Sequence, residues 1–436
     1  MKPPIFAKKA NPQTAERPLM QAPNKLAMTF VLATVALDSI GIGLIFPVMP
    51  DLLTDVTGST LGQAALWGGL LTASFAVMQF LFGPIVGNLS DRFGRRPIFL
   101  VSLAVMAVDY VMMALAHTVW LLLAARMIAG VAAATHSTAY AYVADISAPD
   151  DRAKRFGLVG AAFGLGFVAG PMLGGALAVI DTRAPFWAAA ALATANLIFG
   201  YFILPESLKP ALRRPFNLKR ANPLSSFAAI RKLPGLRILL LVSFVYAVTF
   251  NVWPAIWSYY GKAAFGWNPL WIGISLAIFG ICMATAQATL VAPMIKRFGE
   301  KRTATYGMMA EVGTYTFFGF VSSGFWALVF TPLTALGGVT GPALQAMTSR
   351  LTPETQQGEL QGINTSINAL AMIIAPLVMT FIFQIFTAPT APVFLPGAPF
   401  LLSAVLMVAV IIIFVAAPRA VTPDATLASP ETGGTP

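Results

Sequence analysis

Apolar residues in this chain gather into twelve long, nearly uninterrupted segments separated by polar connections. A helix needs about 20 apolar residues to cross the hydrocarbon core of a bilayer. Twelve segments meet that requirement, namely residues 27–50, 64–86, 97–116, 119–139, 156–179, 185–204, 236–258, 270–294, 303–321, 325–345, 358–384 and 397–417. Several connections are only a few residues long, so neighbouring spans must be antiparallel. The pattern predicts an all-α membrane protein with twelve transmembrane helices.

Composition and the placement of the cations agree with this topology. Hydrophobic residues make up 57% of the chain and charged residues 10%, against about 25% charged in soluble domains. The polar, basic start has no apolar core and so is not a cleavable signal peptide. With both termini in the cytoplasm, all but three of the 28 Lys and Arg residues fall in cytoplasmic segments, as the positive-inside rule requires. The net charge of +11 therefore reports topology and does not indicate nucleic-acid binding.

The longest polar connection divides the spans six and six. It covers residues 205–235 and separates a first half, 27–204, from a second half, 236–418, with tails at 1–26 and 419–436. We expect this basic linker to be solvated and to touch anionic lipid headgroups, and the Pro- and Thr-rich C-terminal tail to be disordered. The sequences at 91–96 and 296–301 echo each other after the second span of each half. This repeat predicts two six-helix bundles with the substrate site between them.

Residues 87–97 are the most concentrated charged run between two spans. Two glycines and the final proline predict a tight turn, and its charges are expected to pair with helix ends or with acids such as Asp145. The alternative is a basic turn that only fixes orientation. The whole run resembles the loop between the second and third helices of the major facilitator superfamily of transporters. That resemblance implies a cytoplasmic gate formed by Gly87, Asp91, Arg92, Gly94, Arg95 and Arg96.

Four ionisable residues are clear cases of a charge deep within a predicted span: Asp38, Asp109, Arg126 and Glu311. Each costs at least about 2.5–3.5 kcal/mol on insertion scales, so such residues normally mark an ion or substrate pathway. We interpret them as proton-coupling residues. A buried Arg needs an anionic partner, and either Asp109 or Asp38 can supply it. A static ion pair is the alternative for Arg126, and a neutral, hydrogen-bonded glutamic acid is the alternative for Glu311.

The fifth span contains Gly166, Gly170, Pro171 and Gly174. Small residues permit close helix contact, and packing alone explains most of this pattern. The string at 166–175 also resembles the fifth-helix motif that marks proton-coupled antiporters among facilitators, which implies export.

Other polar or special residues in the spans are candidates for lining a substrate cavity, although interhelical hydrogen bonding also accounts for them. They are Gln79, His136, Met283, Gln287, Gln345, Gln361, Asn364 and Asn368. Together with the stretches at 37–47, 109–110, 163–166, 265–268, 342–345 and 356–358, the motifs resemble the bacterial drug–proton antiporters, and within them the tetracycline-resistance exporters. The resemblance covers residues 36–376.

That resemblance implies specific roles. Asp38, Asp109 and Arg126 match the family's essential charged positions, and Gln79 and Gln287 match polar positions of its drug pathway. Met283 departs from the family, which carries a histidine there. A thioether binds no proton and is a poor ligand for magnesium. Glu311 replaces an aspartate and keeps the carboxyl group.

We therefore expect a monomeric antiporter in a bacterial inner membrane that exports a tetracycline-like or other amphipathic drug by alternating access. The proton is the coupling ion, no cofactor is expected, and magnesium enters only with a chelated tetracycline. A proton-coupled transporter of a small metabolite with the same fold is the alternative, and a non-transporting receptor is a more distant one. An enzyme is disfavoured, because no nucleophile–base spacing or nucleotide loop is present. The single cysteine, Cys282, excludes an internal disulfide and a cysteine-based metal site.

Overall fold

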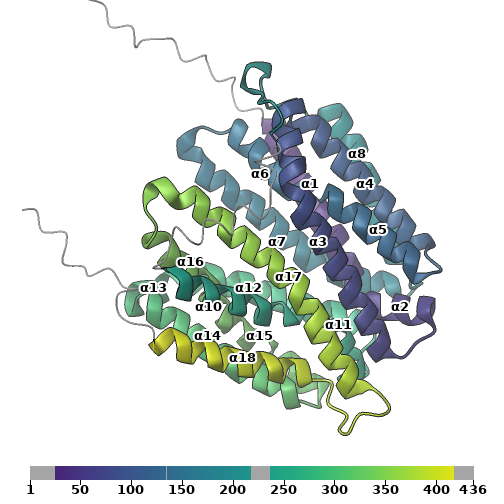
Figure 1. Ribbon diagram of the computed structural model, residues 1–436. Coiled ribbons are helices and arrows are strands. Elements are labelled where there is room, and N and C mark those ends of the chain that lie inside the picture. Colours follow the sequence, from purple (N-terminus) through teal and green to yellow (C-terminus); the bar gives the residue numbers. More distant parts are fainter. Residues whose placement is uncertain (1–24, 134, 218–235, 417–436) are drawn as a thin grey trace, which may run out of the picture.

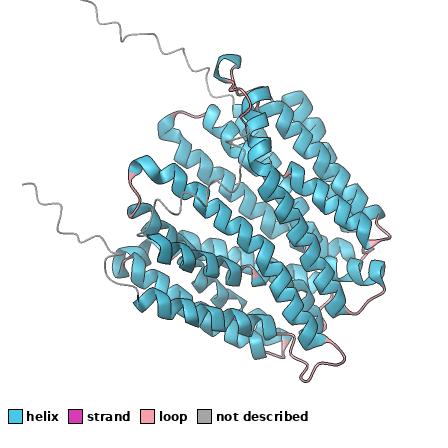
Figure 2. Ribbon diagram, viewed as in Figure 1, coloured by secondary structure: helices cyan, strands magenta, loops and turns pink. Residues whose placement is uncertain are grey.

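All regular structure in the described part of the chain is helical. The computed structural model describes residues 25–133, 135–217 and 236–416 (Figure 1), and Figure 2 shows helices joined mostly by short loops. Eleven helices in these residues are long and apolar enough to cross a membrane. A twelfth crossing is α14 (Glu300–Phe320), which falls short in apolarity because it carries Glu311 and several Gly, Thr and Tyr residues. The chain is thus the all-α, twelve-helix membrane protein that the sequence predicts.

The first half contains eight α-helices. They are α1 (Lys25–Ile45), α2 (Met49–Thr57), α3 (Leu61–Phe93), α4 (Arg95–Leu115), α5 (Val119–Ala132), α6 (Thr135–Asp145), α7 (Arg152–Ala178) and α8 (Ala184–Ile203). The described helices of the second half are α10 (Arg237–Phe250), α11 (Val252–Phe265), α12 (Pro269–Thr289), α13 (Val291–Phe298), α14, α15 (Gly324–Thr334), η4 (Ala335–Val339), α16 (Thr340–Arg350), α17 (Gln357–Thr387) and α18 (Ala398–Ala416). Several crossings therefore consist of two consecutive helices.

Several predicted spans have different ends in the structure, and the first and seventh show the reasons. The first was expected to run to residue 50, but α1 ends at Ile45 and a turn precedes α2, because Pro47 has no N–H with which to continue the helix. The seventh was expected to end at residue 258, but α11 continues to Phe265. It ends where Gly266 adopts the left-handed conformation (φ 66°), which suits glycine.

The predicted turn at residues 87–97 is almost entirely helical, which corrects the expectation from sequence. α3 continues through Asp91 to Phe93, and α4 begins at Arg95. Only Gly94 leaves the helical conformation, with φ 111° and ψ 162°. A residue without a Cβ reverses the chain there in a single step, so Gly87 and Pro97 are not needed for the turn.

The internal repeat extends to this turn and to its ion pairs. Gly299 separates α13 from α14 with φ 78° and ψ 165°, as Gly94 separates α3 from α4. The residue after Gly94 is Arg95, which pairs with Asp145 at the end of α6 at 3.2 Å. In the second half Glu300 pairs with Arg350 at the end of α16 at 2.8 Å. The two halves thus use the same bridge with the charges exchanged.

The halves are joined by two helix pairs, α3 with α17 and α7 with α12, and α7 also packs on α1. The α1–α7 contact depends on the glycines of α7. A Cβ at Gly170 would lie 2.7 Å from the carbonyl oxygen of Ile40 and 2.8 Å from the Cα of Gly43. Gly166 and Gly174 abut the α1 backbone in the same way. Helix α7 therefore lies as close to α1 as two helix backbones can approach.

Gly170→Ala is expected to lower the thermal stability of the purified protein, because both neighbours of the new methyl group are backbone atoms that cannot move independently. Overpacking of this kind costs about 1–3 kcal/mol. Gly164→Ala on the same helix is the matched control, since its Cβ would meet nothing within 4 Å. Equal melting temperatures for the two variants would contradict this packing account.

Candidate functional site

The two halves touch from the middle of the molecule to one end, which we call the α2 end. There Asp51 on α2 forms an ion pair with Lys262 on α11. The hydroxyl of Ser258 donates a hydrogen bond of 2.8 Å to the carbonyl oxygen of Phe46. Toward the opposite end, which we call the Gly94 end, a Cβ at Gly83 or Gly87 would meet nothing within 4 Å. The described contacts therefore close the molecule at the α2 end.

Three of the four intramembrane ionisable residues belong to the first half. Asp109 on α4 is fully buried and pairs with Arg126 on α5, so it is one acid that partners this arginine. The Arg126 guanidinium also lies 5.6 Å from the ring centre of Phe75. Asp38 on α1 is 5% exposed and lies close enough to Tyr110, the neighbour of Asp109, to interact with it electrostatically.

Glu311 stands apart from this group, on α14 of the second half. It is 4% exposed, and a Cβ at Gly337 of η4 would lie 2.7 Å from its Oε1 atom. Tyr246 and Tyr315 lie within electrostatic range. Within the described residues, its Oε2 atom is buried and has no hydrogen-bond partner. A buried polar atom of this kind calls for a proton or a water molecule.

A polar cavity of about 360 Å³ lies beside Tyr246 in the second half. Its side chains come mainly from α10, α16 and α17, and its hydrogen-bonding groups are Ser243, Tyr246, Gln345, Thr348, Gln361, Asn364, Thr365 and Asn368. The structure thus brings together four residues expected from sequence, Gln345, Gln361, Asn364 and Asn368. Tyr246, which the sequence analysis did not single out, is both in the wall of this cavity and near Glu311.

The remaining cavity candidates are dispersed. Gln79 donates a hydrogen bond of 3.3 Å to the carbonyl oxygen of Ala133, between α5 and α6, in line with the interhelical alternative. Gln287 is exposed on α12. Met283, one turn earlier, packs against Gly338. His136 lies in α6, and its side chain is outside the described residues.

The charged residues at the Gly94 end form one network. Arg95 pairs with Asp91 at 2.7 Å and with Asp145 at 3.2 Å. Arg96 donates a hydrogen bond of 2.6 Å to the carbonyl oxygen of Tyr201, while Arg92 lies over the ring of Phe93.

Sequence reasoning missed Glu206 in this network. Its carboxylate accepts hydrogen bonds from the backbone N–H groups of Arg95 and Arg96, at 2.8 and 3.3 Å, and so caps the positive end of α4. The only sequence signal for this role of Glu206 was its position directly after the sixth span, as an acid in a basic stretch. The described part of the linker is therefore docked on the first half; residues 218–235, and most of the two predicted tails, lie outside the described residues.

Comparison with known proteins identifies the family. The model of the Major Facilitator Superfamily matches residues 31–253 and 238–434, and the chain belongs to this superfamily. It is 44% identical over 357 residues to the class C tetracycline resistance protein of Escherichia coli, covering 82% of this chain and 89% of that protein. The class G tetracycline resistance protein of Vibrio anguillarum is 39% identical over 360 residues, covering 81% and 89%.

A solved structure shares the fold. The human organic anion transporter MFSD10 (TETRAN) superposes with a TM-score of 0.66 at 26% identity, covering 90% of this chain and all of that one. The protein is accordingly a multi-pass membrane transporter rather than an enzyme, with two homologous halves and buried ionisable groups in each.

Lys262→Asp is expected to separate the halves at the α2 end, because it places a second carboxylate beside Asp51. Spin labels at Ser59, between α2 and α3, and at Thr390, between α17 and α18, report the separation as an electron-resonance distance in a Cys282→Ser background. The exchanged pair, Asp51→Lys with Lys262→Asp, should restore the wild-type distance. Identical distances in all three proteins would show that this ion pair does not hold the α2 end closed.

Proposed function

We propose that this transporter is a proton-coupled antiporter that exports a tetracycline-like or other amphipathic drug by alternating access. The observation that carries the proposal is the presence of a deeply buried carboxyl in each half, Asp38 and Glu311, in a molecule whose halves meet at one end. Intramembrane carboxyls mark proton relays in transporters. The tetracycline resistance proteins among its relatives support a drug as substrate.

We propose that both termini lie in the cytoplasm of a bacterial cell and that the protein lies in the inner membrane. The Gly94 end, where Arg92, Arg95 and Arg96 cluster, then faces the cytoplasm, in keeping with the positive-inside rule. The α2 end faces outward. In this orientation the halves are closed toward the outside, the conformation in which an exporter loads its substrate from the cytoplasm.

The transport cycle assigns a role to each ionisable residue. In the outward-open state Asp38 or Glu311 takes a proton, and in the inward-open state the proton leaves and substrate binds. Each proton that moves down 100 mV supplies about 2.3 kcal/mol, so one or two protons can drive a useful drug gradient. Arg126 holds or releases the carboxylate of Asp109 as protonation changes.

The substrate site in this proposal is the polar cavity, with Gln345 and Asn364 in its wall, and Gln79, His136, Met283 and Gln287 along the path to it. Its hydrogen-bonding groups are amides and hydroxyls, which suit a neutral or zwitterionic molecule rather than a strongly charged one. The thioether of Met283 is a poor magnesium ligand. Magnesium is therefore needed only as part of a chelated tetracycline.

Asp38→Asn is expected to abolish drug-driven proton release, because an amide cannot carry the proton. Everted vesicles with an acidified lumen receive tetracycline with magnesium, then other amphipathic drugs, and proton release from the lumen is followed by fluorescence. Wild type alone should respond. Absence of release with every drug, despite correctly inserted protein, would instead favour a metabolite transporter of the same fold.

Asp91→Asn tests the proposed gate formed by Gly87, Asp91, Arg92, Gly94, Arg95 and Arg96. The change removes one carboxylate from Arg95 but leaves Asp145 in place, so the expected result is at least a tenfold loss of transport with unchanged expression and melting temperature. Asp150→Asn, at an exposed acid in the turn between α6 and α7, serves as the control. A matching fall in the melting temperature of Asp91→Asn would make the network structural and not a gate.

A further inference from the structure

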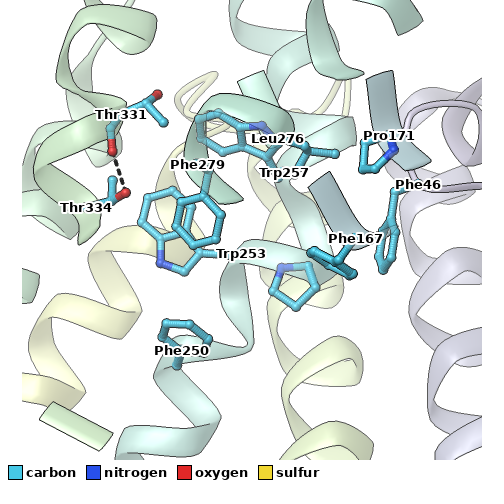
Figure 3. A pocket seen from close by; sticks show the side chains of 11 residues that line it. Phe46, Phe167, Pro171, Phe250, Trp253, Trp257, Leu276, Phe279, Thr331 and Thr334 are labelled. Atoms are coloured by element: carbon cyan, nitrogen blue, oxygen red, sulfur yellow. Dashed lines mark hydrogen bonds between the residues drawn. The ribbon is translucent and has the colours of Figure 1, made fainter. Parts of the chain in front are cut away.

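A second cavity lies between the halves, close to the point where α1 ends (Figure 3). Its volume is about 130 Å³. Phe46, Phe167 and Pro171 come from the first half. The second half contributes Phe250, Trp253, Pro254, Trp257, Leu276, Phe279, Thr331 and Thr334. We call it the aromatic cavity.

The polar groups of three lining residues are already occupied. The hydroxyls of Thr331 and Thr334 donate to carbonyl oxygens of their own helix, at 2.7 and 2.5 Å. The indole N–H of Trp257 donates to Ser275 at 2.8 Å. An apolar cavity of about 150 Å³ in another protein stays dry and binds benzene, and the aromatic cavity is of similar size and lining.

The aromatic cavity adjoins the polar cavity. Phe250 lines the first and Tyr246 lines the second. These two rings stack with their centres 6.0 Å apart, and so form a common wall. An elongated ligand with one end in the aromatic cavity would extend past this pair toward the polar cavity.

We propose that the aromatic cavity is the binding subsite for one terminal aromatic ring of a ligand, and that the other end of such a ligand carries hydroxyl or amide groups. The physiological role of this subsite rests on the proposed export function, whereas the binding of a ring to the aromatic cavity does not. Aromatic walls give the ring edge and face contacts, which favour it over an aliphatic chain of equal size.

The subsite also couples ligand binding to closure of the α2 end. Its walls come from both halves, and Phe46 carries the carbonyl that Ser258 binds when the α2 end is closed. When that end opens, the ring loses the walls supplied by one half. A ligand shifts a conformational equilibrium only by its differential affinity, so the ring stabilises the closed state and is released when the α2 end opens.

The test titrates bromobenzene into the purified protein in nanodiscs and follows tryptophan fluorescence, which the bromine atom quenches. Exposed residues such as Trp120 and Trp326 are quenched in proportion to the bromobenzene dissolved in the lipid. Trp253 and Trp257, which are 8% and 3% exposed, should add a saturable component in wild type.

Thr334→Phe fills the aromatic cavity and should weaken the saturable component at least tenfold. Thr316→Phe is the matched control, because Thr316 is exposed and also bonds its own helix backbone, at 2.7 Å. Phe279→Ala enlarges the cavity and should create saturable quenching by 1-bromonaphthalene that wild type lacks. A gain of binding cannot arise from misfolding, so this variant protects the test against a folding defect.

Lys262→Asp, which opens the α2 end, should weaken bromobenzene binding several-fold, and Asp51→Lys with Lys262→Asp should restore it. Wild type without a saturable component, or an unaltered component in Thr334→Phe, would overturn the subsite. Saturable binding without drug-driven proton release would leave the subsite standing and overturn the proposed export function instead.

Discussion

No ionised side chain can remain unpaired in hydrocarbon, and the two halves of this transporter meet that constraint differently. In the first half, Asp109 and Arg126 form an ion pair between α4 and α5, and Asp38 on α1 lies within electrostatic range of Tyr110 beside that pair. In the second half, Glu311 has no basic partner within ion-pair distance among the described residues. Its carboxyl must be neutralised by a proton or reached by water, and Tyr246 places it beside a polar cavity.

Helix α7 packs against helices of both halves. Its glycines bring it against the backbone of α1, which carries Asp38, while its other side packs on α12. Gly273 of α12 abuts the carbonyl group of Pro171, and Pro171 lines the aromatic cavity. A displacement of α1 that accompanies a change at Asp38 therefore reaches the interface between the halves through rigid backbone contacts. Contacts made only by side chains would absorb such a movement, because side chains can change rotamer.

Sequence predicts this fold well, because long apolar segments and the distribution of Lys and Arg are set by the membrane itself. The repeat at Gly94 and Gly299 is also visible in sequence. The features that could not be predicted from the sequence depend on tertiary contacts. Gly94 makes the turn alone, so α3 runs through residues that looked like a loop. Glu206 lies far from Arg95 in sequence yet caps α4. Tyr246 resembles any other apolar-face tyrosine until α14 and α17 are packed around it.

The central claim is that substrate and protons compete for the same state of the protein. Calorimetric titration of the purified transporter with magnesium–tetracycline, in buffers of different ionisation enthalpy at one pH, counts the protons released on binding. Wild type should release protons when it binds the drug, in an amount that the calorimeter can measure. Asp38→Asn combined with Glu311→Gln should bind the drug without releasing protons. Drug binding to wild type with the same heat in every buffer would contradict the account, because substrate and proton would then bind independently.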